Sequence, residues 1–328
     1  MVKKINSPDN KNILSCAREV MNYSSISSTD RFDKPNFNGD KFLEKLPIHS
    51  PKLISLLKNI HNLDKRDYTE DRKLYKHFIF SDIKKGYGAK IIASAMMAAG
   101  YKLVMKNEKN KIILDQAEIN NKNESKFAIL SSTAVWNTAM NPNNSKKILE
   151  TFNDRPGNIY GDKVRFIILD SGFKEGVDLF DVRYAHIFEE QMTDADLIQA
   201  VGRGTRFCGQ KGLTFENNKG WVLGTFIYKL YKTTPSDILK LKFFKGKEPI
   251  LDDIKKLNKN LYSRIKFTEE ISNVIKDVSV DKLLNDSINK KNDKYKKYYD
   301  IAKIIIPVAG IFTVGAGIMA IKKKYFKK

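Results

Sequence analysis

Two arginines in the run QAVGRGTRFCG, residues 199–209, are the strongest candidates for chemistry in this chain. Arg203 and Arg206 are one helical turn apart, shortly after Gln199 and Gly202. A guanidinium group presents a planar fork of N–H donors that matches phosphate oxygens. Two such groups at this spacing indicate a phosphoryl-transfer site, where arginines stabilise the charge of the transferring phosphate.

A glycine-containing loop precedes this run. Residues 165–190 read RFIILDSGFKEGVDLFDVRYAHIFEE, which is an apolar strand, a loop and a second apolar strand. Gly172 and Gly176 allow the loop to approach a ligand closely. Because ligands of parallel α/β sheets gather at the carboxyl ends of the strands, we expect this loop to face one.

These segments together resemble the second RecA-like lobe of superfamily 2 helicases. QAVGRGTR resembles their motif VI (QxxGRxxR), SGFKEGVDL resembles motif V, and residues 77–103 resemble the opening strand and helix with motif IV. The wider spellings FKEGVDLFDVRYAHIFE and GRGTRFCGQKGLTF are similar to the helicase-like transcription ATPases of nucleocytoplasmic large DNA viruses, of the poxvirus and giant-virus kind. The resemblance covers roughly residues 48–285.

The resemblance implies roles for particular residues. Arg203 and Arg206 would be the catalytic arginines that contact the γ-phosphate of ATP. The residues implied in nucleotide binding come from both motifs and are Gly176, Asp178, Gln199 and Gly202.

One half of the expected ATPase is not recognisable. The string G-x-x-x-x-G-K-[ST], which cradles phosphates, does not occur in the chain, and Lys85–Lys90 (KGYGAK) lacks both its spacing and its hydroxyl. The chain therefore reads as an enzyme only together with a first lobe, which would share the ATP and hold the Mg²⁺. No metal site is expected in this chain itself. That lobe, or another transcription or replication subunit, is an expected partner.

Nucleic acid is the second expected partner. Polar residues follow the first and third expected strands, where hydroxyl groups and backbone N–H groups suit sequence-independent phosphate contacts. The candidates are Ser81, Lys84, Lys85, Ser131, Ser132 and Thr133. The chain carries 59 Lys and Arg against 38 Asp and Glu, a net charge of +21, which also suits a polyanion or an anionic membrane surface.

The end of the sequence differs in composition from the rest. Residues 304–321 are 18 residues without a charge, flanked by lysines, which predicts a transmembrane tail anchor. As a helix, this segment would span about 27 Å. The two cysteines, Cys16 and Cys208, form no metal-ligand spacing and favour a reducing compartment. We therefore expect membrane anchoring by the C-terminus, with the lobe in the cytoplasm, including a host cytoplasm or virion.

The expected fold is α/β, with a RecA-like parallel sheet covered by helices on both faces, a helical extension and a C-terminal transmembrane helix. Apolar strands alternate with helical runs, as in sheets buried on both sides. The expected strands are 77–81, 101–105, 127–131, 165–170, 184–189 and 221–228. The expected domains are a polar linker or N-terminal extension (1–47), the lobe (48–233), a charged helical extension (234–300) and the anchor (301–328).

Two other functions stay open. The chain could be a catalytically inert, membrane-tethered module that binds nucleic acid or a partner, or a decayed gene fragment with a new tail. A neighbouring reading frame that encodes the phosphate-binding loop and the magnesium carboxylates would favour the split enzyme.

Overall fold

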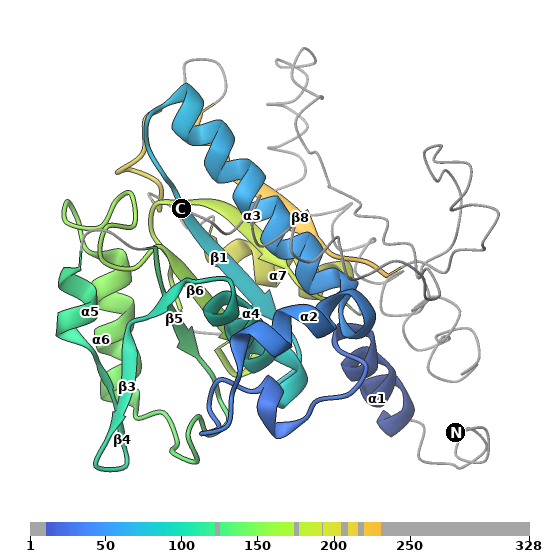
Figure 1. Cartoon of the computed structure of the whole chain (residues 1–328). Coiled ribbons are helices and arrows are strands. Elements are labelled where there is room, and N and C mark those ends of the chain that lie inside the picture. Colours follow the sequence, from blue (N-terminus) through green and yellow to red (C-terminus); the bar gives the residue numbers. More distant parts are fainter. Residues whose placement is uncertain are drawn as a thin grey trace, which may run out of the picture.

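A six-stranded parallel sheet forms the centre of the protein (Figure 1). The computed structural model describes residues 11–121, 125–173, 177–191, 193–204, 209–215 and 220–230 of the 328. The strand order is β2-β5-β6-β1-β7-β8. The strands are β1 (Lys76–Ser81), β2 (Lys102–Leu103), β5 (Lys126–Leu130), β6 (Phe166–Asp170), β7 (Val182–Ile187) and β8 (Gly224–Ile227).

Helices connect these strands. Ser50 caps the longest of them, α3, through Leu53 N, and Pro51 occupies its first turn. The α-helices are α1 (Lys11–Asn22), α2 (Gly39–His49), α3 (Pro51–Glu70), α4 (Ile91–Ala98), α5 (Gln116–Asn120), α6 (Pro142–Asn153) and α7 (Asp194–Val201). Shorter turns of helix are Ser28–Asp30, Gly86–Lys90, Ser171–Phe173 and Gly202–Gly204.

Helices α3 and α6 cover opposite faces of the sheet. Lys76 Nζ donates to the carbonyl of Phe152 in α6, while the next residue, His77, faces Asp64 in α3. Successive side chains of a strand point to opposite faces, so the two contacts lie on the two sides of β1. The fold is therefore the expected α/β sheet with helices on both faces.

Central strand β1 is buried over its whole length and pairs in parallel with β6 on one side and β7 on the other. Phe78 and Ile79 are completely buried. The chain runs from β1 to the β2 side of the sheet, returns to β6, and then crosses β1 to reach β7. The strand order reverses at β1, and in open α/β sheets such a reversal marks where ligands bind.

The N-terminal segment, expected as a polar linker or N-terminal extension, contains two α-helices. Within residues 11–49, helix α2 packs into the core of the sheet domain, and α1 is hydrogen-bonded to that domain through Arg18 and Asn22. Tyr23 and Phe42 are completely buried and their rings stack with centroids 5.7 Å apart. Tyr23, Phe32 and Phe42 are the buried aromatic residues that hold this stretch against the core. They are widely spaced in a mainly polar sequence, so its average composition does not reveal them.

A two-stranded antiparallel hairpin, β3 (Met105–Glu108) and β4 (Lys111–Leu114), was not expected. It follows β2 and projects below the sheet in Figure 1, on the side where the strands of the large sheet end.

The expected helical extension (234–300) and the predicted anchor (304–321) lie outside the described residues. In the part of the chain that the structure does describe, none of the helices has the length and apolar character needed to cross a bilayer.

Candidate functional site

Two buried carboxylates organise the loops at the carboxyl edge of the sheet. After β7, Glu189 accepts hydrogen bonds from the Ser81 hydroxyl (2.6 Å) and from Asp82 N (2.8 Å), both at the end of β1. It also accepts from the Asn22 amide at the end of α1. Arg18 of α1 adds an ion pair to Asp82 at 2.8 Å. The N-terminal helix is therefore tied to the loop that follows β1.

The second carboxylate, Asp170 at the end of β6, holds the loop that follows β5. One of its oxygens accepts from Ser131 Oγ (2.9 Å), Ser132 N (2.7 Å) and Ser132 Oγ (3.1 Å). The other accepts from Gly172 N at 2.9 Å. A Cβ added at Gly172 would lie 2.1 Å from Ser132 Cβ, so this glycine allows the two loops to approach closely.

The six candidate nucleic-acid residues therefore differ in accessibility. Ser81 and Ser131 are buried and hydrogen-bonded to Glu189 and Asp170. The Thr133 hydroxyl donates to the carbonyl of Lys84 at 2.8 Å and joins the loops after β1 and β5.

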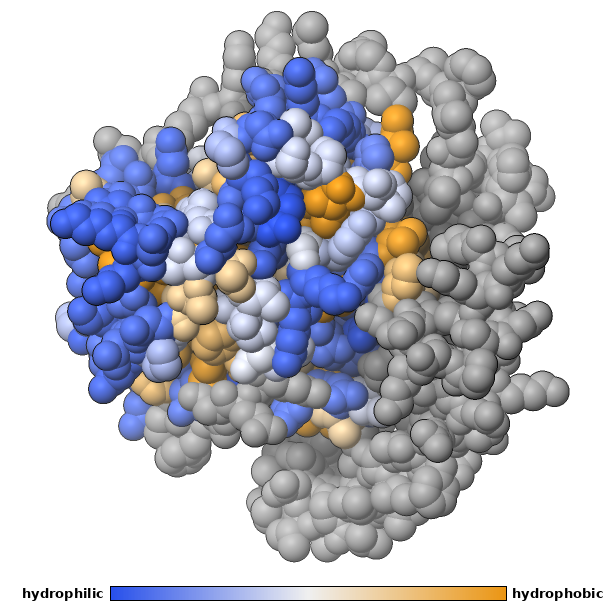
Figure 2. Space-filling view, turned by 90° about the horizontal axis from the view of Figure 1, so that it is seen from below, coloured by the Kyte–Doolittle hydropathy of each residue, from blue (hydrophilic) through white to orange (hydrophobic). Residues whose placement is uncertain are grey.

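The remaining three candidates, Ser132, Lys84 and Lys85, are exposed. Figure 2, which looks at the molecule from below Figure 1, shows a mainly hydrophilic surface with small separate apolar patches.

Motif V and motif VI lie side by side. Leu179 N donates to the carbonyl of Arg203 at 3.2 Å, and Arg203 Nη1 donates back to the carbonyl of Val177 at 3.4 Å. Arg203 is only 4% exposed, so in this conformation its guanidinium lies under the motif V loop. Gly176 and Arg206 lie outside the described residues.

The other candidate nucleotide residues lie at the surface around this junction. Asp178 and Gln199 are exposed, and Gly202 is half-buried. A Cβ added at Gly202 would have no atom within 4 Å, so packing within the lobe does not require glycine there.

An ion pair between half-buried Arg155 and buried Asp181, which the sequence did not indicate, supports the same junction. Arg155, after α6, donates through Nε and Nη2 to the two carboxylate oxygens of Asp181, each at 2.7 Å. Asp181 also accepts from Gly212 N (2.9 Å), and its own N–H donates to the carbonyl of Gly209 (2.8 Å). The segment after motif VI is thus fixed to the end of motif V. Asp181 lies two residues after the motif V sequence, and nothing in its spacing identifies Arg155 as its partner.

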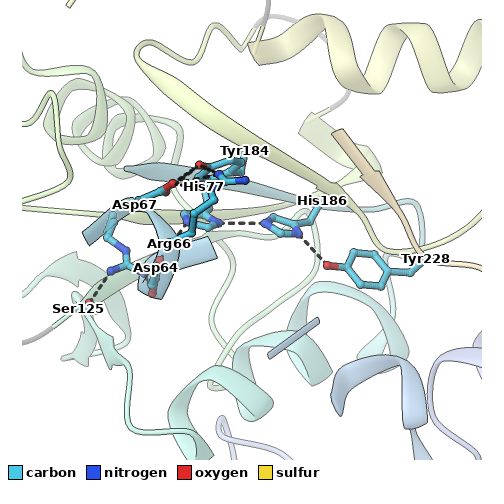
Figure 3. Close-up of polar contacts among 9 residues, drawn as sticks. Asp64, Arg66, Asp67, His77, Ser125, Tyr184, His186 and Tyr228 are labelled. Carbon is cyan, nitrogen blue, oxygen red and sulfur yellow. Dashed lines mark hydrogen bonds and ion pairs between the residues drawn. The ribbon is translucent and has the colours of Figure 1, made fainter. Parts of the chain in front are cut away.

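A series of hydrogen bonds links side chains on the face of the sheet that α3 covers (Figure 3). His77 Nδ1 lies 2.9 Å from His186 Nε2, and His186 Nδ1 lies 2.8 Å from the Tyr228 hydroxyl. Asn59 donates to that hydroxyl at 3.0 Å, and Asp64 lies 3.6 Å from His77 Nε2 at the other end. These two histidines are 109 residues apart in the sequence, and the pairing of β1 with β7 brings them together.

Both rings are held neutral. Burial lowers the pKa of His77, despite the opposing effect of nearby Asp64, and it lowers the pKa of His186 far more. Both side chains are fully buried, so they have no access to a substrate in this structure. The chain of hydrogen bonds is therefore a structural network. Within the described residues, no cluster of three His, Cys, Asp or Glu side chains is suited to hold a metal ion.

Comparison with known proteins identifies relatives in a giant virus. A protein of Acanthamoeba polyphaga mimivirus named "Putative ATP-dependent RNA helicase" is 32% identical over 93 residues, which are 28% of this chain and 11% of that protein. A second mimivirus protein of the same description is 24% identical over 189 residues, or 58% of this chain and 27% of that protein. The chain thus spans about a tenth and about a quarter of these relatives.

No family model matches the chain. Among solved structures, the C-terminal part of the Fun30 ATPase domain aligns with 81% of this chain and 84% of its own, at 13% identity and a TM-score of 0.41. The strand order and the aligned mimivirus sequences lead to one conclusion. The chain is a distant homologue of these two mimivirus proteins, and its six-stranded parallel sheet is RecA-like.

Proposed function

We propose that the chain acts as the second lobe of a superfamily 2 NTP-dependent helicase or translocase, with ATP bound between it and a first lobe that holds Mg²⁺. The observation that carries this proposal is the junction between motifs V and VI. Two segments that the resemblance assigns to one nucleotide are joined through Leu179 N, Arg203 and Val177 O. The Arg155–Asp181 pair fixes the chain on either side of them.

In this proposal Arg203 and Arg206 are the arginines that stabilise the transferring phosphate. Arg203 begins under the motif V loop and would have to leave the carbonyl of Val177 to reach a phosphate. A guanidinium binds a phosphate group more strongly than it binds a neutral carbonyl, and this difference favours the exchange once nucleotide is present. The open space beside Gly202 leaves room for the first lobe to approach.

The nucleic-acid strand would follow the carboxyl edge of the sheet. Ser132, Thr133, Lys84 and Lys85 supply the surface, and Ser81 and Ser131 support it from below by hydrogen bonds to carboxylates. This arrangement divides the six candidates into contact residues and supporting residues.

The test is ATP hydrolysis with a first lobe supplied in trans, a lobe that carries its own phosphate-binding loop. We expect the chain alone to be inactive and the mixture to be active. Arg203→Ala and Arg206→Ala should each lower the rate by about 10³–10⁵. Arg72→Ala, which changes an exposed arginine at the opposite edge of the sheet, is the matched control. Turnover by the chain alone, lost on Arg206→Ala, would overturn the proposal of a shared site.

We further propose that residues 304–321 anchor the protein in a membrane with the lobe in the cytoplasm. The support is the 18-residue uncharged run between lysines. Carbonate extraction of the full chain should leave it in the membrane pellet, whereas a version ending at Tyr299 should be extracted. Recovery of both versions in the supernatant would refute the anchor.

A further inference from the structure

The β3–β4 hairpin presents lysines at its exposed end. Its two strands are joined by a two-residue turn, Lys109–Asn110, because Glu108 pairs with Lys111 directly across it. Lys106, Lys109 and Lys111 are all exposed. Lys106, Glu108 and Lys111 lie on one face of the two-stranded ribbon.

The base of the hairpin is fixed, so its tip has a defined position. Met105 and Ile112 are buried, and Asn144 of α6 donates to the carbonyl of Ile112. Met105 sulfur accepts a weak hydrogen bond from Ile129 N in β5 at 3.4 Å. The hairpin therefore continues from the core of the lobe and ends in solvent, below the sheet in Figure 1.

One side-chain contact joins the hairpin to the loop that follows β5. Asn107 Nδ2 reaches Thr138 Oγ1 at 3.5 Å, in the loop that begins with Ser132 and Thr133. Lys34 Nζ contacts Asn137 in the same loop at 3.3 Å. The hairpin thus lies beside the loop after β5, which Thr133 joins to the carbonyl of Lys84, and Lys106 and Lys111 lie on the face of the ribbon opposite Asn107.

The turn carries a residue that the backbone disfavours. Lys109 has φ +49° and Asn110 has φ +58°, as in a type I′ turn. Asn and Gly are the preferred residues for positive φ, and a lysine in this conformation is strained. Asn110 suits its position and Lys109 does not. Residues kept in strained conformations cluster at functional sites.

We propose that the hairpin tip is a further nucleic-acid contact of the lobe, with Lys106, Lys109 and Lys111 bound to the phosphate backbone of a single strand that runs along the carboxyl edge. This inference rests on the proposed function and deepens it. The ligand chemistry is a row of phosphodiesters, which DNA and RNA share. The lysines suit it because they are exposed charges with no base-reading geometry; Lys106 also lies 3.7 Å from Asp115, so Lys109 and Lys111 are the stronger contacts.

The decisive variant is Lys109→Asn in the full chain. Asparagine relieves the strain at positive φ, so the midpoint of thermal unfolding should rise, while affinity for a single-stranded oligonucleotide of about 20 nucleotides should fall about threefold at low salt. The matched control is Asn110→Gly, which also favours the turn but keeps all lysines. It should raise the unfolding midpoint and leave affinity unchanged. A higher unfolding midpoint together with a lower affinity in Lys109→Asn, and not in Asn110→Gly, would support the proposal, because a purely structural turn predicts no loss of affinity.

A triple variant, Lys106→Ala/Lys109→Ala/Lys111→Ala, measures the electrostatic contribution. Between about 50 mM and 200 mM salt, the slope of log affinity against log salt should become shallower by about 2, or about 0.7 per lost phosphate contact. The control removes three exposed lysines on or after α3, namely Lys58, Lys65 and Lys73. Equal losses in both triple variants would mean that net charge alone matters, and would overturn the inference.

The outcomes separate this inference from the function on which it rests. Binding by the unchanged chain, with the same slope in the hairpin variants, would refute the hairpin contact and leave the lobe assignment intact. No binding by the unchanged chain at low salt would overturn both. DNA and RNA strands of one sequence, titrated in parallel, show which of the two the surface prefers.

Discussion

Two polar regions of this protein look alike in composition and differ in access to solvent. Beneath α3, the network of Asp64, His77, His186 and Tyr228 has the residue types of a catalytic constellation, yet the two rings and Tyr228 are completely buried. At the carboxyl edge, Ser132 and Lys84 have unremarkable side chains and are exposed. The comparison indicates that accessibility, and not residue type, distinguishes the two. The buried network specifies how β1, β7 and α3 pack, and the exposed edge is available to ligands.

A single acidic residue anchors the buried network, and its loss should have the largest effect on stability. Arg165, only 3% exposed, donates to Asp64 and, through Nη1, to Ser125 at 3.0 Å. Burial alone would raise the pKa of Asp64, but Arg165 and His77 hold it below its usual value. Asp64→Ala should lower the free energy of unfolding by about 3–5 kcal/mol, because it leaves a buried guanidinium without its carboxylate. Urea denaturation measures the loss.

The milder Asp64→Asn keeps a hydrogen-bond acceptor and should cost less than Asp64→Ala. If Asp64→Ala leaves the urea midpoint unchanged, the network does not stabilise the fold and the contrast with the exposed edge fails.

Acid should weaken the same network. The pKa values of His77 and His186 are lowered in the folded protein. Below about pH 6.5 these histidines are therefore protonated in the unfolded chain while they are still neutral in the folded chain. Their contribution to stability is complete above pH 6.5 and is lost as the pH falls from there toward the lowered values. Each histidine contributes a slope of up to about 1.4 kcal/mol per pH unit. Thermal unfolding between about pH 7.5 and 5 measures it, and His186→Gln should flatten the curve.

A buried lysine on the other face of the sheet offers a test at higher pH. Burial lowers the pKa of Lys76 from 10.5 to about 7, with a smaller opposing effect of Asp181. Stability should therefore rise as the pH increases from 7 toward 10.5. In this range the unfolded chain still binds a proton at Lys76 that the folded chain has released, so raising the pH disfavours the unfolded state. Lys76→Met should be more stable than the unchanged protein at pH 7 by about 1–3 kcal/mol and should vary less with pH.

The carbonyl that Lys76 contacts makes this substitution tolerable. Phe152 O accepts from Lys76 Nζ (2.7 Å) and also from Asn158 Nδ2 (2.9 Å), so it keeps a partner when the lysine is removed. A destabilised Lys76→Met protein at neutral pH would show that the ammonium group contributes net stability. Lys52, whose pKa burial lowers to about 8, is unchanged in this variant. It should account for the pH dependence of stability that remains in the variant.

The smallest stability effects should come from the exposed edge. Lys84→Ala should leave the unfolding midpoint within about 0.5 kcal/mol of the unchanged protein, as is usual for exposed substitutions. It should weaken single-strand binding severalfold at low salt, since it removes one phosphate contact. Ser131→Ala, in the buried support of the same loop, should show the reverse, with lower stability and a smaller loss of binding. Equal behaviour of the two variants would remove the distinction between contact and supporting residues.

Much of the fold could be predicted from the sequence, since five of the six sheet strands begin and end within one or two residues of their expected limits, and β8 begins three residues later than expected. The short β2 was expected to be longer. The β3–β4 hairpin was missed because its strands are short and carry Lys106, Glu108 and Lys111, and because its turn, Lys109–Asn110, lacks glycine. Local pattern cannot detect strands that depend on one buried residue each.

The candidate site could be predicted less completely. The sequence places the motif V and VI residues in order, but it cannot show that Arg203 is buried or that Asp181 pairs with Arg155 across 26 residues. It also cannot distinguish Ser131 from Ser132, which are adjacent hydroxyls with opposite exposure. Such differences arise from tertiary packing, which a single sequence does not encode locally.

The central position of β1 also has a consequence for how the protein is made. Its two strand partners, β6 and β7, begin at residues 166 and 182, so residues 82–165 must be synthesised before either is available. During that time the apolar sequence Phe78-Ile79-Phe80 has no partner strand in the nascent chain. Long-range parallel pairing of this kind folds slowly and exposes aggregation-prone segments. Helix α3, which is made earlier, faces this strand in the finished lobe through the contact of Asp64 with His77, and it is available to shield the strand on the ribosome.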